Sequence, residues 1–377
     1  MKKHKKKSKI PDYNEEIENE KLEKFQNAKI YFDRMEIFKS MLSDKHKVMA
    51  LESIPEEERH LYLHHIKSAD AIMSVFDKYS QNVDKERVFE FLTTRLKGNA
   101  DKYLQLLSMV DFKVKLNPEI PVIKLNNLNV LNIDMLSNIQ KNVSDYYNMK
   151  FKLNERAYDK IEYTFGEMCA IMMKLQELTA GIDPNASEMD KFSIIYERMT
   201  SMITYDHDCI TKTNILEDIR ERELEARDYD SASKTYEKFL EARRDAAGLF
   251  GGLVNGKAIC AGYSMILHEA LQYVGIKSKY IEGHPKYDSQ IKHAHAWNQV
   301  KIEGKWYNVD STWDAGNLQQ IGFWRFALLD DKAFKKSHID FPYVYSEHYP
   351  CTDPKNQLFG PESRLETKGG LDKWKLI

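Results

Sequence analysis

The segment around Cys260 places a thiol where a helix is expected to begin. Gly256 and Lys257 precede the cysteine, and apolar residues follow it at helical spacing as far as Val274. Gly275 then fits the position that ends such a helix. Unpaired N–H groups and the helix dipole favour an anion at the first turn, so this placement lowers a thiol pKa and raises its nucleophilicity. The position alone also fits an inert core cysteine.

A second segment, HAHAWNQVKIEGKWYNVDSTWD (residues 293–314), offers a base for that thiol. Its alternation predicts two strands joined by a turn at Glu303 and Gly304. With a two-residue loop, His295 and Asp310 become diagonal neighbours on one face of the hairpin. A carboxylate so placed can hold an imidazole in the tautomer that a general base needs. The two segments together therefore predict a thiol, an imidazole and a carboxylate in one site.

These two segments resemble the transglutaminase-like superfamily, whose fold is papain-like. GKAICAGYSMILHEAL (256–271) carries the cysteine at a helix start, and the hairpin carries the H-A-W, G-K-W-Y and V-D-x-T-W blocks in the family order. ERMTSMITYD (197–206) resembles the helix that precedes the core, and FWRFALLDDKAF (323–334) resembles its trailing strand. The resemblance covers roughly residues 187–350.

The resemblance implies a role for each member of the predicted site. Cys260 would be the nucleophile, His295 the general base and later acid, and Asp310 the residue that orients His295. The family reaction is acyl transfer from a protein or peptide amide through a thioester, which an amine or water then resolves. The sequence does not distinguish transamidation from deamidation or proteolysis. It also does not assign the second oxyanion donor.

Four further residues are candidates for the substrate cleft. Gly256 keeps the backbone before the thiol uncluttered, and Tyr263 follows one turn into the helix. Trp297 and Trp306 fall on the His295 face of the expected hairpin, where they could wall a cleft or equally be core aromatics.

Two other interpretations of the site compete with catalysis. His293 and His295 project from one strand face, and His284 and Cys260 could join them in a zinc site. Structural zinc usually takes four N/S ligands at tighter paired spacing, so no metal site is expected. No EF-hand loop is present and no cofactor is expected, although some animal members of the superfamily use calcium. A catalytically inactive domain that binds a protein partner is the other alternative.

The remaining cysteines do not suggest a second nucleophile. Cys169 lies beside an apolar helical stripe, Cys209 has acidic neighbours that would raise its pKa, and Cys351 has no base nearby in sequence. Four cysteines in 377 residues are too few for a disulfide framework and fit a reduced compartment. With no secretory signal or transmembrane stretch in view, a cytoplasmic location is expected.

The resemblance implies an α+β protein with a papain-like transglutaminase core, and the composition before it predicts a mainly α-helical region. A net charge of −2 favours neither nucleic acid nor membrane as a partner, and nothing indicates the oligomeric state. The charged insertion is expected to be a solvated helical hairpin, with a lid as the alternative. The expected segments are a basic disordered tail (1–11), a mainly helical region (12–180) with a β-like interruption near 112–133, the transglutaminase-like domain (187–350) with its charged helical insertion (214–245), and a C-terminal extension (351–377).

Overall fold

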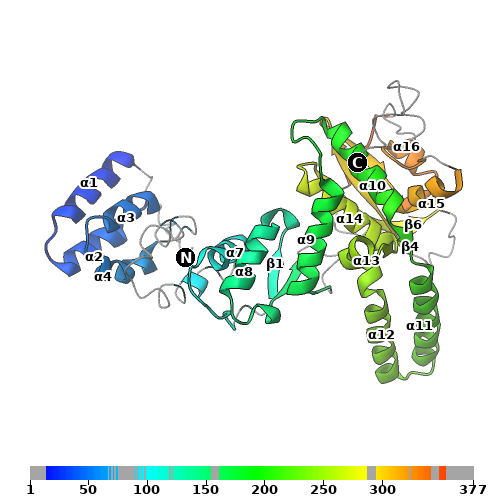
Figure 1. Cartoon of the computed structure of the whole chain (residues 1–377), viewed down its shortest axis with the longest axis horizontal. Coiled ribbons are helices and arrows are strands. Elements are labelled where there is room, and N and C mark those ends of the chain that lie inside the picture. Colours follow the sequence, from blue (N-terminus) through cyan, green and yellow to red (C-terminus); the bar gives the residue numbers. More distant parts are fainter. Residues whose placement is uncertain are drawn as a thin grey trace, which may run out of the picture. The chain divides into compact units, whose positions relative to one another are not determined.

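The computed structural model describes most of the chain as two compact units. The first comprises residues 1–121 and 137–146, and the second residues 122–136 and 147–377 (Figure 1). The expected basic tail, His293 and most of the C-terminal extension lie outside the described residues. The described residues are 14–66, 92–94, 99–118, 122–153, 161–286, 294–321, 324–340 and 348–353, with a few single positions between 68 and 120.

The first unit is helical, and side-chain caps define where its helices begin. Asn14, Ser43 and Asn99 each accept a backbone N–H from the first turn of the helix that follows. Phe25, Phe38 and Tyr62 form its aromatic centre, with ring centroids 5.1–5.8 Å apart. Its elements are α1 (Glu15–Asn27), α2 (Tyr31–Ser40), α3 (Asp44–Leu51), α4 (Glu56–Arg59), η1 (His60–His65) and α7 (Ala100–Met109).

The predicted β-like interruption is correct only in its middle part. β1 (Val122–Leu125) is a strand, but residues 112–116 contribute one isolated bridge, and residues 128–133 form no strand. The latter begin as η2 (Leu128–Val130), because the Asn127 side chain accepts the Asn129 N–H and caps a helical turn. Helix α8 (Ile133–Asn142) and η3 (Tyr146–Asn148) follow.

A small sheet opens the remainder of the second unit. β1 pairs in parallel with β2 (Lys150–Leu153), which pairs antiparallel with β3 (Tyr163–Thr164). Thr164 and Glu167 form a capping box that starts α9. Helices α9 (Phe165–Thr179), α10 (Glu188–Met202), α13 (Leu249–Val254) and α14 (Cys260–Tyr273) pack together (Figure 1).

The main sheet has the order β8-β7-β6-β9, and α14 packs against β6 and β7. All its pairings are antiparallel. Glu303 and Gly304 both have positive φ, as the predicted two-residue hairpin turn requires, and the predicted register is confirmed by the pairing of Asn298 with Val309. The strands are β6 (Ser278–Pro285), β7 (His295–Ile302), β8 (Lys305–Val309) and β9 (His338–Asp340).

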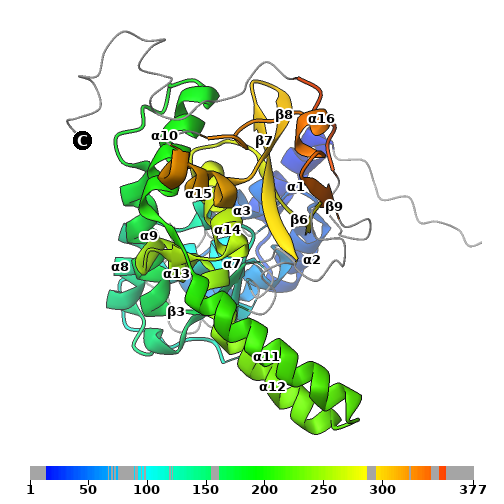
Figure 2. The same ribbon diagram turned by 90° about the vertical axis from the view of Figure 1, so that its right-hand side faces the viewer.

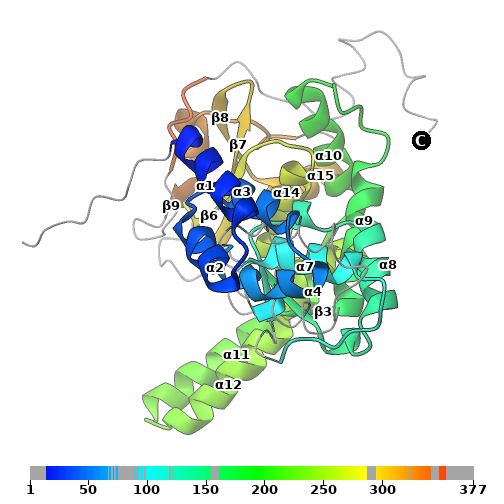
Figure 3. The same cartoon turned by 90° about the vertical axis from the view of Figure 1, so that its left-hand side faces the viewer.

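The charged insertion is a helical hairpin of α11 (His207–Glu225) and α12 (Tyr229–Ala247). Figure 2, and Figure 3 from the opposite side, show it running away from the main sheet. Its base adjoins the two-stranded pairing of β4 (Thr204–Tyr205) with β5 (Lys257–Ala258). Among the described residues, no helix is both long and apolar enough to cross a bilayer.

The segment after β8 differs from the expected trailing strand. Residues 324–334 make one isolated bridge, between Leu329 and Asn308, and then form the short helix α16 (Asp331–Phe334). Asp330 caps α16 by accepting the Ala333 N–H, which favours a helix over a strand there. Helix α15 (Ser311–Ile321) precedes this segment, and β9 takes the edge of the sheet.

Candidate active site

Cys260 is the first residue of α14, as the sequence predicted. The strand β5 delivers the chain to this point, and Ile259 precedes the helix without offering a side-chain cap. The first intrahelical bond runs from the Tyr263 N–H to the Ile259 carbonyl. The N–H groups of the first turn, before Tyr263, therefore have no acceptor inside the helix and lie at the end that carries the thiol. Cys260 itself is buried.

His295 begins β7, and its Nε2 lies 2.8 Å from Oδ2 of Asp310. Asp310 follows β8 directly and is fully buried. Its other oxygen, Oδ1, accepts the N–H groups of Thr312 and Trp313 at 3.0 and 3.1 Å, so the carboxylate also caps α15. These backbone bonds fix the carboxylate, and the carboxylate fixes one ring nitrogen of His295.

The second ring nitrogen of His295 is available to the thiol. The His295 imidazole and the Ala296 N–H both act on the Cys260 sulfur and favour its ionised form. Since Nε2 is committed to Asp310, Nδ1 is the atom left for this contact. The structure thus brings together the three residues that two separate sequence segments predicted.

The electrostatics favour a thiolate–imidazolium pair. Burial opposes ionisation of Cys260, but the neighbouring His295, the Ala296 N–H and Arg243 outweigh it and lower the pKa of the thiol. Burial likewise favours neutral His295, yet Asp310 and Cys260 raise its pKa to about 10. Burial also opposes ionised Asp310, and the two histidines beside it hold its pKa well below the usual range.

The second of these histidines, His338, was missed in the sequence. It is buried on β9, and its Nε2 lies 3.0 Å from Oδ2 of Asp310. Its Nδ1 lies 2.8 Å from the Ser337 hydroxyl. β9 reaches the site by pairing with β6, a contact that no local pattern in the sequence encodes.

His295, Asp310 and His338 also form a possible metal-ligand group, with one ligand atom of each within 4.8 Å of the others. The Nε2 atoms of both histidines bond to the same carboxylate oxygen, which accounts for the cluster as a hydrogen-bond network. The zinc alternative drew on different partners. His284 of that set bonds instead to the Pro285 carbonyl at 3.2 Å.

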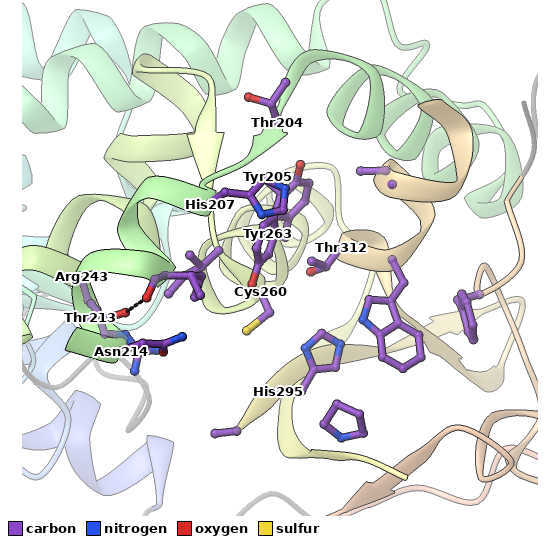
Figure 4. Close-up of a pocket in the computed structure, with 18 of the residues that line it drawn as sticks. Thr204, Tyr205, His207, Thr213, Asn214, Arg243, Cys260, Tyr263, His295 and Thr312 are labelled. Carbon is purple, nitrogen blue, oxygen red and sulfur yellow. Dashed lines mark hydrogen bonds between the residues drawn. The ribbon is translucent and has the colours of Figure 1, made fainter. Parts of the chain in front are cut away.

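A cavity of about 960 Å³ opens over the thiol and the imidazole (Figure 4). Cys260 and His295 both line it. Trp313 lines it beside His295, with the two rings stacked at 5.2 Å. The opposite wall comes from the base of the α11–α12 hairpin, through Ile210, Thr213, Asn214, Glu217, Phe239 and Arg243.

Comparison with known proteins identifies a family domain in the part of the chain that carries these residues. Residues 176–311 match the model of the transglutaminase-like superfamily, and this span contains the thiol, the imidazole and the carboxylate. Residues 176–311 are a transglutaminase-like superfamily domain. The fold around them is mixed α+β, with a helical region preceding the transglutaminase-like core, as predicted.

Named relatives of the transglutaminase-like domain are distant. It is similar to kyphoscoliosis peptidase of Homo sapiens and of Mus musculus, each 31% identical over 118 residues. That alignment covers 29% of this chain and only 17% of the relative. A solved structure described as "Crystal structure of a TGase" matches with 18% identity and a TM-score of 0.28, over 54% of this chain and 45% of that one.

Of the four cleft candidates, the cavity of the transglutaminase-like domain takes in Tyr263. Gly256 lies instead in the turn before β5, with φ of 70°, and its carbonyl accepts the Thr204 N–H. Trp297 is fully buried against Phe334 behind the site, and Trp306 stacks on a tyrosine ring at 4.4 Å. Their face of the hairpin was predicted, but Trp297 on it packs into the core and Trp306 is only partly buried. Trp313 lines the cavity instead.

The other cysteines lack the surroundings of Cys260. Burial raises the pKa of Cys169, and burial with the nearby Asp206 raises that of Cys209 to about 11. Cys351 is buried, with its sulfur 3.2 Å from the Gln299 amide nitrogen. Helix α14 also carries the buried Glu269, whose Oε2 accepts the Leu128 N–H.

Proposed function

We propose that the transglutaminase-like domain catalyses cysteine-dependent acyl transfer on protein or peptide amides. The observation that carries the proposal is the chain of contacts from Cys260 to His295 to Asp310 at the edge of an open cavity. A thiol, an imidazole and a carboxylate in this order are the groups that thiol-based acyl transfer requires.

The reaction begins with attack of the Cys260 thiolate on the carbonyl carbon of the bound amide. The C–N bond of the tetrahedral intermediate then breaks, and His295 gives its proton to the departing amine or ammonia. A thioester on Cys260 remains. His295, now neutral, takes a proton from an incoming amine or water, which attacks the thioester and releases the thiolate.

The N-terminus of α14 supplies the stabilisation that the intermediate needs. The oxyanion of the tetrahedral intermediate develops next to the sulfur. There the first-turn N–H groups and the dipole of α14 favour negative charge. Asp310 stays ionised throughout and stabilises the imidazolium. Whether an amine or water completes the reaction depends on which reaches the thioester, so transamidation, deamidation and proteolysis share these first steps.

The test is turnover of a glutamine-containing peptide library by the full chain, with and without a dansylated primary amine. Mass spectrometry distinguishes the amine adduct, the deamidated peptide and the cleaved peptide. We expect at least one product, and an acyl adduct on Cys260 in quenched samples. Cys260→Ser and His295→Ala should lower the rate by about a hundredfold or more, with Cys209→Ser as the control cysteine variant.

The opposite outcome would identify the alternative function. If the folded wild-type chain yields no product and no adduct, while still retaining peptides, the domain is a binding module that kept the family fold. Circular dichroism of each variant separates loss of chemistry from loss of structure.

A further inference from the structure

The base of the α11–α12 hairpin is fixed directly to the helix that carries the thiol. The Ile259 N–H donates to the carbonyl of Ala246, near the end of α12, at 2.9 Å. Gly262, in the first turn of α14, lies so close that an added Cβ would be 2.3 Å from that same carbonyl oxygen. The hairpin base is therefore a fixed wall of the site.

Arg243 presents a cation from this wall. Its side chain is partly buried and lines the cavity. Its guanidinium lies over the Phe239 ring, 5.2 Å from the ring centroid. In Figure 4, Arg243 and Asn214 lie on the hairpin side of Cys260, away from Thr312. Among the described residues, no carboxylate comes within 4.0 Å of this guanidinium.

The neighbouring arginine shows what a satisfied guanidinium looks like in the same helix. Arg244 bonds to Glu167 at 2.8 Å, to Asp245 at 2.6 Å and to the Glu162 carbonyl at 2.7 Å. Arg243, one residue earlier, faces the cavity without such partners. Because no carboxylate of the described residues pairs with Arg243, its N–H donors are available for a ligand.

The chemistry of this wall selects a carboxylate. A guanidinium is planar and donates two parallel N–H bonds to a carboxylate, and the Phe239 ring beneath it holds its plane. The Asn214 amide, on the facing helix, is a further donor at the same wall. Arg243 also acts on the thiol, since its charge contributes to lowering the pKa of Cys260, which places the guanidinium within electrostatic reach of the reacting atoms.

One acidic residue lies on the same wall and opposes this selection. Glu217 lines the cavity from α11, one turn beyond Thr213. It is exposed and makes no ion pair with Arg243 within 4.0 Å. Its charge weakens the attraction for an anionic ligand, so its removal gives a test of opposite sign.

We propose that the hairpin base is a carboxylate subsite, in which Arg243 binds an acidic group of the acyl substrate close to the reactive amide. The substrate class is a peptide or protein segment that carries either an Asp or Glu side chain or a free C-terminus near that amide. The inference rests on the proposed function for the identity of the ligand as a substrate, and on the wall alone for the preference for a carboxylate.

The experiment measures peptide binding to the full chain carrying Cys260→Ala, by fluorescence anisotropy, so that no turnover is needed. Three fluorescent glutamine peptides serve as probes. The first has an internal Glu and an amidated C-terminus, the second has no acidic side chain but a free C-terminus, and the third has no acidic side chain and an amidated C-terminus. We expect one of the first two to bind about tenfold more tightly than the third, and the tighter one identifies the source of the carboxylate.

Variants of the hairpin then assign the preference. Arg243→Gln should abolish the difference between peptides, and Arg243→Lys should keep part of it because the charge remains. Glu217→Gln should increase it. Arg222→Gln, which removes the same charge from an exposed position on α11, should leave it unchanged. Raising the salt concentration should weaken the acidic peptide selectively.

Three results would overturn the proposal. Equal affinity for all three peptides removes the subsite, as does a preference that Arg222→Gln lowers as much as Arg243→Gln does. Failure of the proposed function has a different signature, because a chain without acyl transfer can still discriminate the peptides in this assay. A third pattern, equal loss of wild-type turnover on acidic and neutral peptides in Arg243→Gln, would show that Arg243 serves the thiolate alone and would also overturn the subsite.

Discussion

The Nε2 atom of His338 lies 3.0 Å from Oδ2 of Asp310, the same oxygen that lies 2.8 Å from Nε2 of His295. Both side chains are buried, and Asp310 receives two backbone N–H groups on its other oxygen. The carboxylate is therefore held from three directions. His338 does not reach the cavity, so it acts on the reaction only by positioning Asp310 and stabilising its charge.

Replacing His338 should weaken the site without removing any reacting group. In His338→Phe, Asp310 loses one charge-assisted hydrogen bond, so its grip on the imidazole loosens and the pKa of Cys260 rises. We expect about a tenfold lower alkylation rate of Cys260 at pH 6 and a pH–rate curve displaced to higher pH. His338→Gln can still donate to Asp310 and should restore much of the rate. A variant that lowers the melting temperature but leaves the curve in place would assign His338 a packing role only.

Cys260 should be the most reactive thiol of the chain at mildly acidic pH. An ordinary thiol with a pKa of about 8.5 is almost wholly protonated at pH 6, whereas the pKa of Cys260 is lowered. Iodoacetamide labelling read by peptide mass spectrometry should favour Cys260 over Cys169, Cys209 and Cys351 by more than about tenfold. His295→Ala should remove the advantage.

The pKa of His295 sets the highest pH at which the thiolate–imidazolium pair should persist. Because the pKa of His295 is raised to about 10, the ion pair should persist across neutral pH and be lost only near that value. A labelling curve for Cys260 that rises with a single ordinary thiol pKa, like that of a free cysteine, would contradict the proposed pair.

Local patterns were sufficient to predict the three reacting groups but not their surroundings. The helix at Cys260 and the hairpin from His295 to Asp310 are each encoded within about twenty residues, through spacing and a Glu-Gly turn. His338 comes 28 residues after Asp310 and arrives by pairing with β6. Such long-range pairing leaves no periodic trace in a three-residue strand.

The sequence favoured a solvated hairpin over a lid, and the contribution of the hairpin base to the cavity wall was not predicted, for a related reason. Its composition is highly charged, which favours a solvated helix, and most of its length is solvated. Its base is different, because Thr213 is buried there and Phe239 partly so, and both line the cavity. Only the close approach of α12 to α14 at Gly262 brings that end to the thiol, and backbone proximity of this kind depends on tertiary packing.

The stability of the Cys260→Ala variant should fall as the pH rises above about 6.5. His295 has an ordinary pKa of 6.5 when unfolded, and Asp310 raises this pKa in the folded state, so the folded state binds this proton more tightly. The stability that it contributes is complete below 6.5 and is lost as the pH rises through the folded value. In wild type, the folded thiolate has lost the proton that an unfolded thiol keeps up to a pKa of about 9, and this offsets the imidazolium proton between those two values.

The measurement is the free energy of unfolding in urea at pH 6, 8 and 10. Relative to Cys260→Ala, the double variant Cys260→Ala/His295→Gln should flatten the decline by roughly 1–3 kcal/mol, and wild type should decline less than Cys260→Ala because its thiolate offsets the imidazolium proton. Adding Asp310→Asn to Cys260→Ala should flatten the decline too, because the imidazolium then lacks its carboxylate. Parallel curves for Cys260→Ala and both double variants would rule out the charged imidazole as the source.

Two glycine-to-alanine changes in helices should have opposite effects on stability. At Gly262 the new Cβ would lie 2.3 Å from the Ala246 carbonyl oxygen, so α12 and α14 must separate. We expect a loss of about 2–3 kcal/mol and slower labelling of Cys260, because the first turn of its helix shifts. At Gly166, in α9, a Cβ meets nothing within 4 Å and φ is not positive. There alanine should stabilise the protein by about 0.5–1 kcal/mol through its higher helix propensity. Chemical denaturation of the two variants beside wild type gives both signs, and a tolerated Gly262→Ala would show that the hairpin base is free to move away from the thiol.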